Sequence, residues 1–114
     1  MAAEWVQDVL ARQLAMNAQT WEALQRYGVD ESTELVLDFF YVAPSAHAAW
    51  ELAAFLKAET DYAITVSTGP YGVKGSTQPT AVSLEILDQW VDWMVSAGAE
   101  YGECEFDGWG AQVP

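Results

Sequence analysis

The chain has 114 residues, which suits one domain and is too short for two separate hydrophobic cores. Hydrophobic residues make up 52% of it, and 17 acidic residues against 4 basic ones give a formal net charge of −13. This charge opposes binding to nucleic acid and to anionic membranes, because each phosphate would meet carboxylates.

The acidic residues are spread through patterned segments and do not form a tail, so they indicate the solvated side of a folded domain. They either attract a basic partner or serve solubility alone. Cys104 is the only cysteine, which excludes an intramolecular disulfide and favours a cytoplasmic protein. The first residues lack the pattern of a signal peptide, and no apolar run approaches the roughly 20 residues that cross a bilayer.

An amphipathic helix is predicted over residues 3–27. Apolar side chains recur three or four residues apart along it, at Val6, Leu10, Leu14, Ala18 and Trp21. Gly28 is a typical helix stop. Asn17 and Thr20 are both capping residue types, so a break between two shorter helices remains an alternative.

A strand is predicted over residues 34–43, and it is too apolar to leave either face open to water. Asp38 interrupts it. Pro44 and Ser45 then start a helix over 46–60, for which Trp50 is predicted to face the core.

A hairpin is predicted from strands at 61–68 and 73–82, separated by the turn sequence GPYG. Ser83 starts the next helix, over 84–102. The last strand spans 103–113. Strict alternation along it predicts Cys104 and Phe106 on one face, and it places four residues on the other: Glu103, Glu105, Asp107 and Trp109.

After the first helix the order is β-α-β-β-α-β, which predicts an α+β, ferredoxin-like sandwich with a four-stranded antiparallel sheet. Both crossover helices are expected on one face of that sheet. The extra helical segment, residues 1–28, either covers the other face or lies beside the sandwich. Residues 1–114 are predicted to form this single domain.

No catalytic set, cofactor site or metal site is predicted. His47 is the only histidine and lies at a helix start. Cys104 stands between Glu103 and Glu105, and neighbouring carboxylates disfavour a thiolate, so a small buried hydrophobe is the favoured interpretation.

Trp109 lies between Gly108 and Gly110, which permit unusual backbone angles and clear space around the indole. Either the tryptophan completes the core, or it is a surface that a partner binds. We expect a mostly packed indole, with its N–H satisfied by a nearby group.

The ending FDGWG (106–110) resembles the Asp-Gly-Trp-Gly signature of the regulator of ribonuclease E activity B family. NAQTWEALQRYGVD (17–30) is similar to that family's N-terminal helix-to-glycine pattern, and LDFFYVA (37–43) and DYAITV (61–66) are similar to its first two strands. The resemblance implies a ferredoxin-like fold and a protein that inhibits by binding the ribonuclease E machinery. It assigns no individual roles to Asp107, Gly108, Trp109 and Gly110.

The leading hypothesis is therefore a non-catalytic acidic protein that binds a basic protein, such as ribonuclease E or its scaffold. Its expected contact residues are Asp38, Glu103, Glu105, Asp107 and Trp109. Three alternatives remain open: an immunity protein against a basic toxin nuclease, an enzyme or small-ligand module that uses the sheet face near Trp109, and a homodimer.

Overall fold

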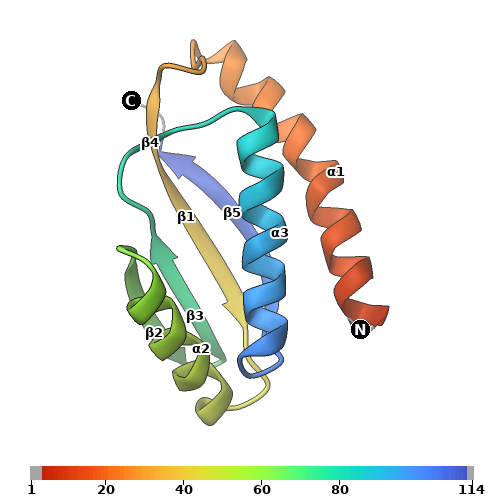
Figure 1. The fold of residues 1–114 in the computed structure, drawn as a ribbon, viewed down its shortest axis with the longest axis vertical. Coiled ribbons are helices and arrows are strands. Elements are labelled where there is room, and N and C mark those ends of the chain that lie inside the picture. Colours follow the sequence, from red (N-terminus) through yellow and green to blue (C-terminus); the bar gives the residue numbers. More distant parts are fainter. Residues whose placement is uncertain (1–3, 113–114) are drawn as a thin grey trace.

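The computed structural model describes residues 4–112, which form an α+β fold of three helices and one five-stranded open sheet (Figure 1). The elements are α1 (Glu4–Arg26), β1 (Glu34–Val42), α2 (Ala46–Glu59), β2 (Ala63–Thr68), β3 (Tyr71–Ser76), β4 (Thr80–Ala81), α3 (Leu84–Glu100) and β5 (Glu105–Gln112). The expected element ends at Ala3 and Val113 lie outside the described residues. Within residues 4–112, no helix combines the length and apolar character needed to span a bilayer.

The sheet is built around β1, which pairs antiparallel with β3, β4 and β5, while β2 pairs antiparallel with β3. The predicted strand 73–82 begins earlier, at Tyr71, and is divided into β3 and β4, so the sheet has five strands and not the expected four. Thr77 lies between these strands and holds β1 by two hydrogen bonds: its N–H donates to the Leu37 carbonyl at 2.9 Å, and its Oγ1 accepts from the Leu37 N–H at 3.0 Å. Pro79, which has no N–H, occupies the interruption.

Local signals place the starts of α2 and α3 as predicted, while α3 ends at Glu100 and not at the expected residue 102. Ser45 and Ser83 are the N-caps of α2 and α3, and their hydroxyls accept from the N–H groups of Ala48 and Ile86 at 3.1 and 3.2 Å. Gly28 follows α1 with φ 87°, the left-handed region that glycine adopts at low cost. The alternative break near Asn17 is absent, because α1 is continuous from Glu4 to Arg26.

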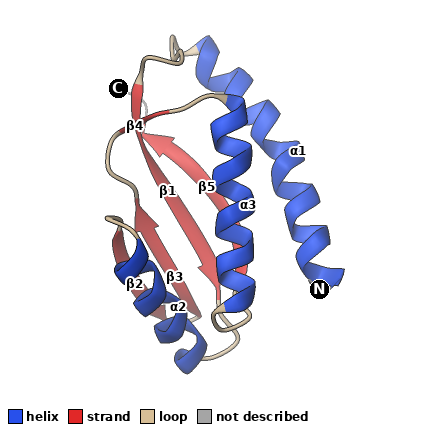
Figure 2. Ribbon diagram, in the orientation of Figure 1, coloured by secondary structure: helices blue, strands red, loops and turns tan. Residues whose placement is uncertain are grey.

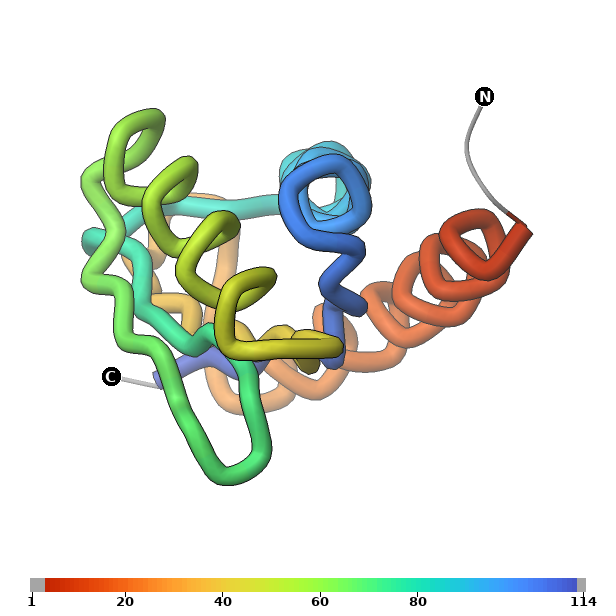
Figure 3. Tube along the Cα trace, turned by 90° about the horizontal axis from the view of Figure 1, so that it is seen from below, coloured from red at the N-terminus to blue at the C-terminus, as the bar shows by residue number. Residues whose placement is uncertain are grey.

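Helices α2 and α3 lie on one face of the sheet, as expected (Figure 2). Alternate residues of β1 are buried on that face: Leu35, Leu37, Phe39 and Tyr41. The opposite face is open, with Phe40 46% and Val42 48% exposed. The expectation that β1 is closed on both faces is therefore wrong, because α1 packs beside α3 and does not cover the far face (Figure 3).

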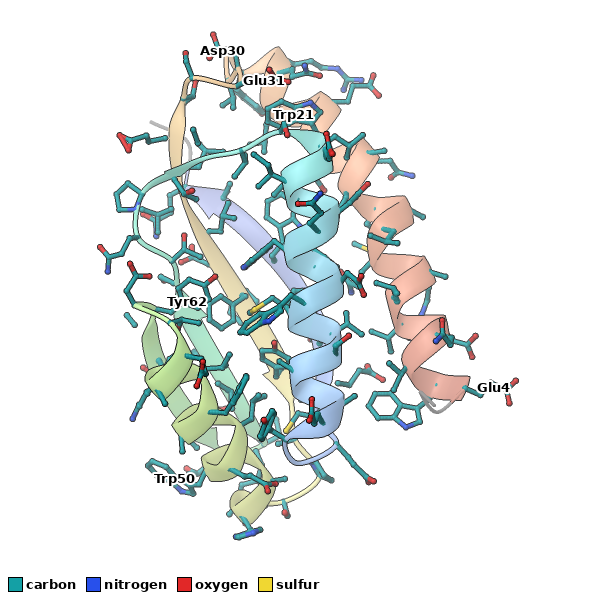
Figure 4. All side chains as sticks on the ribbon, viewed as in Figure 1. Glu4, Trp21, Asp30, Glu31, Trp50 and Tyr62 are labelled. Atoms are coloured by element: carbon teal, nitrogen blue, oxygen red, sulfur yellow. The ribbon has the colours of Figure 1, made fainter. Side chains whose placement is uncertain are left out.

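The buried faces of the helices differ in part from the predicted apolar stripes. Trp50 is 57% exposed, so its predicted core position is wrong. Helix α2 turns its small and aliphatic residues to the sheet, while Trp50 projects away from it near Lys57, whose Nζ lies 5.9 Å from the ring centroid (Figure 4). In α1, Ala18 is exposed and polar Asn17 is buried instead.

Candidate functional site

The last strand contains a β-bulge that changes which residues face the helices. Tyr41 of β1 pairs with Phe106, but Phe40 pairs with Gly108, so Asp107 is an inserted residue. Gly108 has φ 121°, a conformation that side chains other than glycine rarely adopt. The insertion turns both Phe106 and Trp109 toward the helices. The prediction that Trp109 shares a face with Glu105 is therefore wrong.

Trp109 is packed into the junction of α1, α3 and the sheet. Its Nε1 donates to Asn17 Oδ1 at 2.8 Å, and Asn17 Nδ2 donates to Asp88 Oδ1 at 3.0 Å. The indole also meets Trp90 edge to face, with ring centroids 6.1 Å apart. The expected packing is confirmed, but the N–H partner lies on another element and not nearby in sequence. The sequence indicates Asn17 only as a possible helix cap, whereas the packed face of α1 buries it together with Gln13.

The acidic residues predicted to bind a partner do not form one surface with Trp109. Asp38 lies half-buried on the open face, where Ser76 Oγ and Gln112 Nε2 donate to its carboxylate. Glu105 is half-buried opposite Val42 on the same face, and Asp107 is exposed at the bulge. Glu103 is exposed in the turn before β5, with φ 54°. Asp38 thus ties neighbouring strands together, whereas Glu103 and Asp107 are available to solvent.

The open sheet face exposes two apolar side chains, Phe40 and Val42, among charged neighbours. Phe40 lies between Lys74 of β3 and Gly108 of β5, and Val42 lies between Gly72 and Glu105. Glycine has no side chain to cover its neighbour, which is why these two apolar residues stay exposed on a paired central strand. Exposed apolar side chains of this size are candidate contact residues.

A second exposed aromatic group joins the two crossover helices. Phe55 of α2 stacks on Trp93 of α3, with ring centroids 5.9 Å apart and planes at 27°. Phe55 also stacks on Tyr101, directly after α3, at 3.9 Å and 13°. We call Phe55, Trp93 and Tyr101 the aromatic bridge. Trp93 is 41% exposed, so the bridge reaches the surface. Phe55 lies on a different helix from Trp93, so helix periodicity alone does not bring the three residues together.

A cleft of about 240 Å³ opens beside the first turns of α3. Its walls include Tyr62, Ile86 and Trp90, and Trp90 Nε1 donates to Tyr62 Oη at 3.0 Å. Burial raises the pKa of Tyr62. Ligand sites usually measure roughly 300–1,000 Å³, so this cleft suits at most a small group. It lies beside Trp90, whereas the rival hypothesis expected a site near Trp109.

Cys104 and His47 differ in their surroundings. Cys104 is 1% exposed, which confirms the expected buried position, and His47 is exposed in the first turn of α2. Burial, and secondarily the Glu51 carboxylate, raise the pKa of Cys104 to about 11. Within residues 4–112, no three side chains of the metal-binding types are grouped so as to hold an ion.

We expect Cys104 to resist thiol reagents at pH 8 until the protein unfolds. A pKa raised from 9.0 to about 11 leaves about a hundredfold fewer thiolates, and burial blocks access as well. The stability contributed by this retained proton is complete below pH 9.0 and is lost as pH rises through about 11. Labelling with a chromogenic disulfide, with and without denaturant, measures this. Rapid labelling of the folded protein would contradict it.

No protein-family model matches this chain, and no curated protein matches its sequence.

Proposed function

We propose that this chain is a non-catalytic acidic protein that binds a basic protein partner and restrains it. The observation that carries the proposal is the combination of a −13 net charge with large apolar side chains left exposed on the described surface. Long-range attraction raises the rate of encounter with a basic surface. Exposed aromatic residues supply the short-range contacts in which binding energy concentrates.

Two of the four basic residues, Arg26 and Lys57, already interact with other side chains of the same chain. Arg26 Nη2 lies 2.6 Å from Glu22 Oε1, and Lys57 lies over the ring of Trp50. Arg26 offsets one carboxylate charge of α1, and Lys57 lies over an uncharged ring of its own helix. The remaining carboxylates therefore keep an attraction for basic groups supplied by another molecule.

The proposed partner is ribonuclease E or its scaffold, and the proposed setting is the cytoplasm. This part of the proposal depends on the FDGWG resemblance and on the fold that it implies. The ferredoxin-like sandwich is supported by the position of β1 between antiparallel neighbours and by crossover helices that share one face. Trp109 and Gly108 have packing roles, so the shared ending favours a shared fold more directly than a shared partner.

Affinity capture from the native host tests the proposal. With the full chain as bait, we expect a ribonuclease component at low salt and its loss at high salt, because screening weakens attraction between opposite charges. An unrelated acidic protein of similar charge is the control bait. Capture of a basic toxin nuclease would favour the immunity alternative. Absence of any partner that salt releases would contradict the proposed binding function.

A further inference from the structure

We infer that the aromatic bridge of Phe55, Trp93 and Tyr101 is the surface on which arginine side chains of the basic partner dock. This inference rests on the proposed function, and it names the contact surface and the chemistry that it recognises. Trp93 is the exposed member of the bridge at 41%, and the rings of Phe55 and Tyr101 that stack with it are half-buried. A guanidinium group is planar and weakly hydrated, so it stacks on aromatic faces more readily than an ammonium group does.

Two carboxylates lie close to the bridge residues in the sequence. Glu100 immediately precedes Tyr101 and lies two helical turns after Trp93, while Glu51 lies one turn before Phe55 on α2. Both are exposed. The Glu51 carboxylate contributes to the raised pKa of Cys104, whose Sγ lies 3.9 Å from the Tyr101 carbonyl oxygen. A guanidinium group can lie over the face of an aromatic ring while its N–H groups donate to carboxylates. Aromatic rings and carboxylates together are therefore complementary to arginine.

These carboxylates have no basic partner within the described part of the chain. The ion pair found in residues 4–112 is Arg26 with Glu22, on α1. Trp50 offers an internal comparison, since Lys57 of the same helix already lies over its ring. The bridge has the same aromatic chemistry without a cation supplied by its own helices, which leaves it available to another molecule.

The open sheet face is less suited to a cation. Its most exposed aromatic residue, Phe40, has Lys74 as its cross-strand neighbour, and a second positive charge there would meet repulsion. Asp38 on that face already accepts hydrogen bonds from Ser76 and Gln112. Helix α3, which carries Trp93, contains no lysine or arginine, and this favours the helical side for an arginine of the partner.

Titration with a short arginine-only peptide and a lysine-only peptide of equal length tests the inference. We expect the parent to bind the arginine peptide more tightly, and Trp93→Ala to weaken that binding by about tenfold. A double variant, Glu51→Gln with Glu100→Gln, removes charge without touching the aromatic stack, and we expect a similar loss. Isothermal titration gives the affinities, and thermal unfolding shows whether each variant is folded.

Two matched controls separate the bridge from general acidity. Glu4→Gln with Asp8→Asn removes the same charge from exposed positions on α1, and Trp50→Ala removes an exposed tryptophan elsewhere. Both are expected to stay within about twofold of the parent, because neither contributes to the bridge. If the Glu51→Gln/Glu100→Gln variant and the Glu4→Gln/Asp8→Asn variant weaken binding of the arginine peptide equally, the inference is overturned.

The outcomes also distinguish this inference from the proposed function. If folded Trp93→Ala still captures a salt-sensitive basic partner with parental affinity, the docking surface is wrong and the binding function stands. If neither peptide binds the parent, and no basic partner is captured, both fail. Perturbation of the Trp93 indole N–H resonance by the arginine peptide, without a change at Trp50, would support the bridge directly.

Discussion

Replacing Trp109 by alanine is expected to lower the free energy of unfolding by about 3 kcal/mol. The indole packs against both clusters of buried residues, and it meets Trp90 edge to face. Its removal would leave a void at the junction of α1, α3 and β5, and would take away the donor that Asn17 accepts from. Urea denaturation followed by far-ultraviolet circular dichroism measures the loss without relying on tryptophan fluorescence.

Trp50→Ala is the matched control, because that indole is 57% exposed. We expect its effect to stay below about 1 kcal/mol, since little apolar surface returns to water when it is lost. If Trp109→Ala unfolds at the parental urea concentration, the indole is not a core element. The recognition role considered for it from the sequence would then gain support.

Asn17→Ala is expected to cost about 2 kcal/mol, the second largest effect. Asn17 is fully buried, and it links Trp109 to Asp88 by hydrogen bonds of 2.8 and 3.0 Å. Alanine would leave the Trp109 indole N–H and the Asp88 carboxylate without this hydrogen-bond partner, at positions that are only partly exposed to water. The higher helix propensity of alanine returns only a few tenths of a kcal/mol. Urea denaturation of the variant measures the difference.

A double-mutant cycle with Trp109→Phe isolates the hydrogen bond from the packing. We expect a coupling free energy of about 1 kcal/mol or more between the two positions. Gln19→Ala, at an exposed position of the same helix, serves as the uncoupled control. Strict additivity of Asn17→Ala and Trp109→Phe would show that the contact contributes nothing to stability.

Residues that are exposed and contribute little to folding stability are suited to a study of partner binding. Variants of Trp109 would weaken partner binding through loss of folded protein, so they cannot report on contact. Trp93 and Phe40 are exposed at 41% and 46%, and their removal is expected to perturb the fold far less. Binding losses in folded variants at these two positions would locate the partner on the helical side or on the open sheet face.

The sequence alone determined the order of the helices and of the strands other than β4, and the residues at which several of them begin and end. Ser45 and Ser83 cap helices through contacts three residues away, and Gly28 ends α1 through its own backbone angle. These interactions are local, so a short stretch of sequence contains all that they require.

The tertiary structure decided which faces these elements present. Strict alternation predicted that Trp109 shares a face with the acidic residues of β5. In the structure, the pairing of β5 with β1 leaves Asp107 as an inserted residue, and Trp109 therefore faces the core. This register depends on β1, which is distant in the sequence. Asn17 is buried and links Trp109 to Asp88 by hydrogen bonds only because α1 packs against α3 and β5. The aromatic bridge likewise needs α2 and α3 on one face of the sheet. Contacts of this kind depend on the relative placement of whole elements, which local periodicity does not contain.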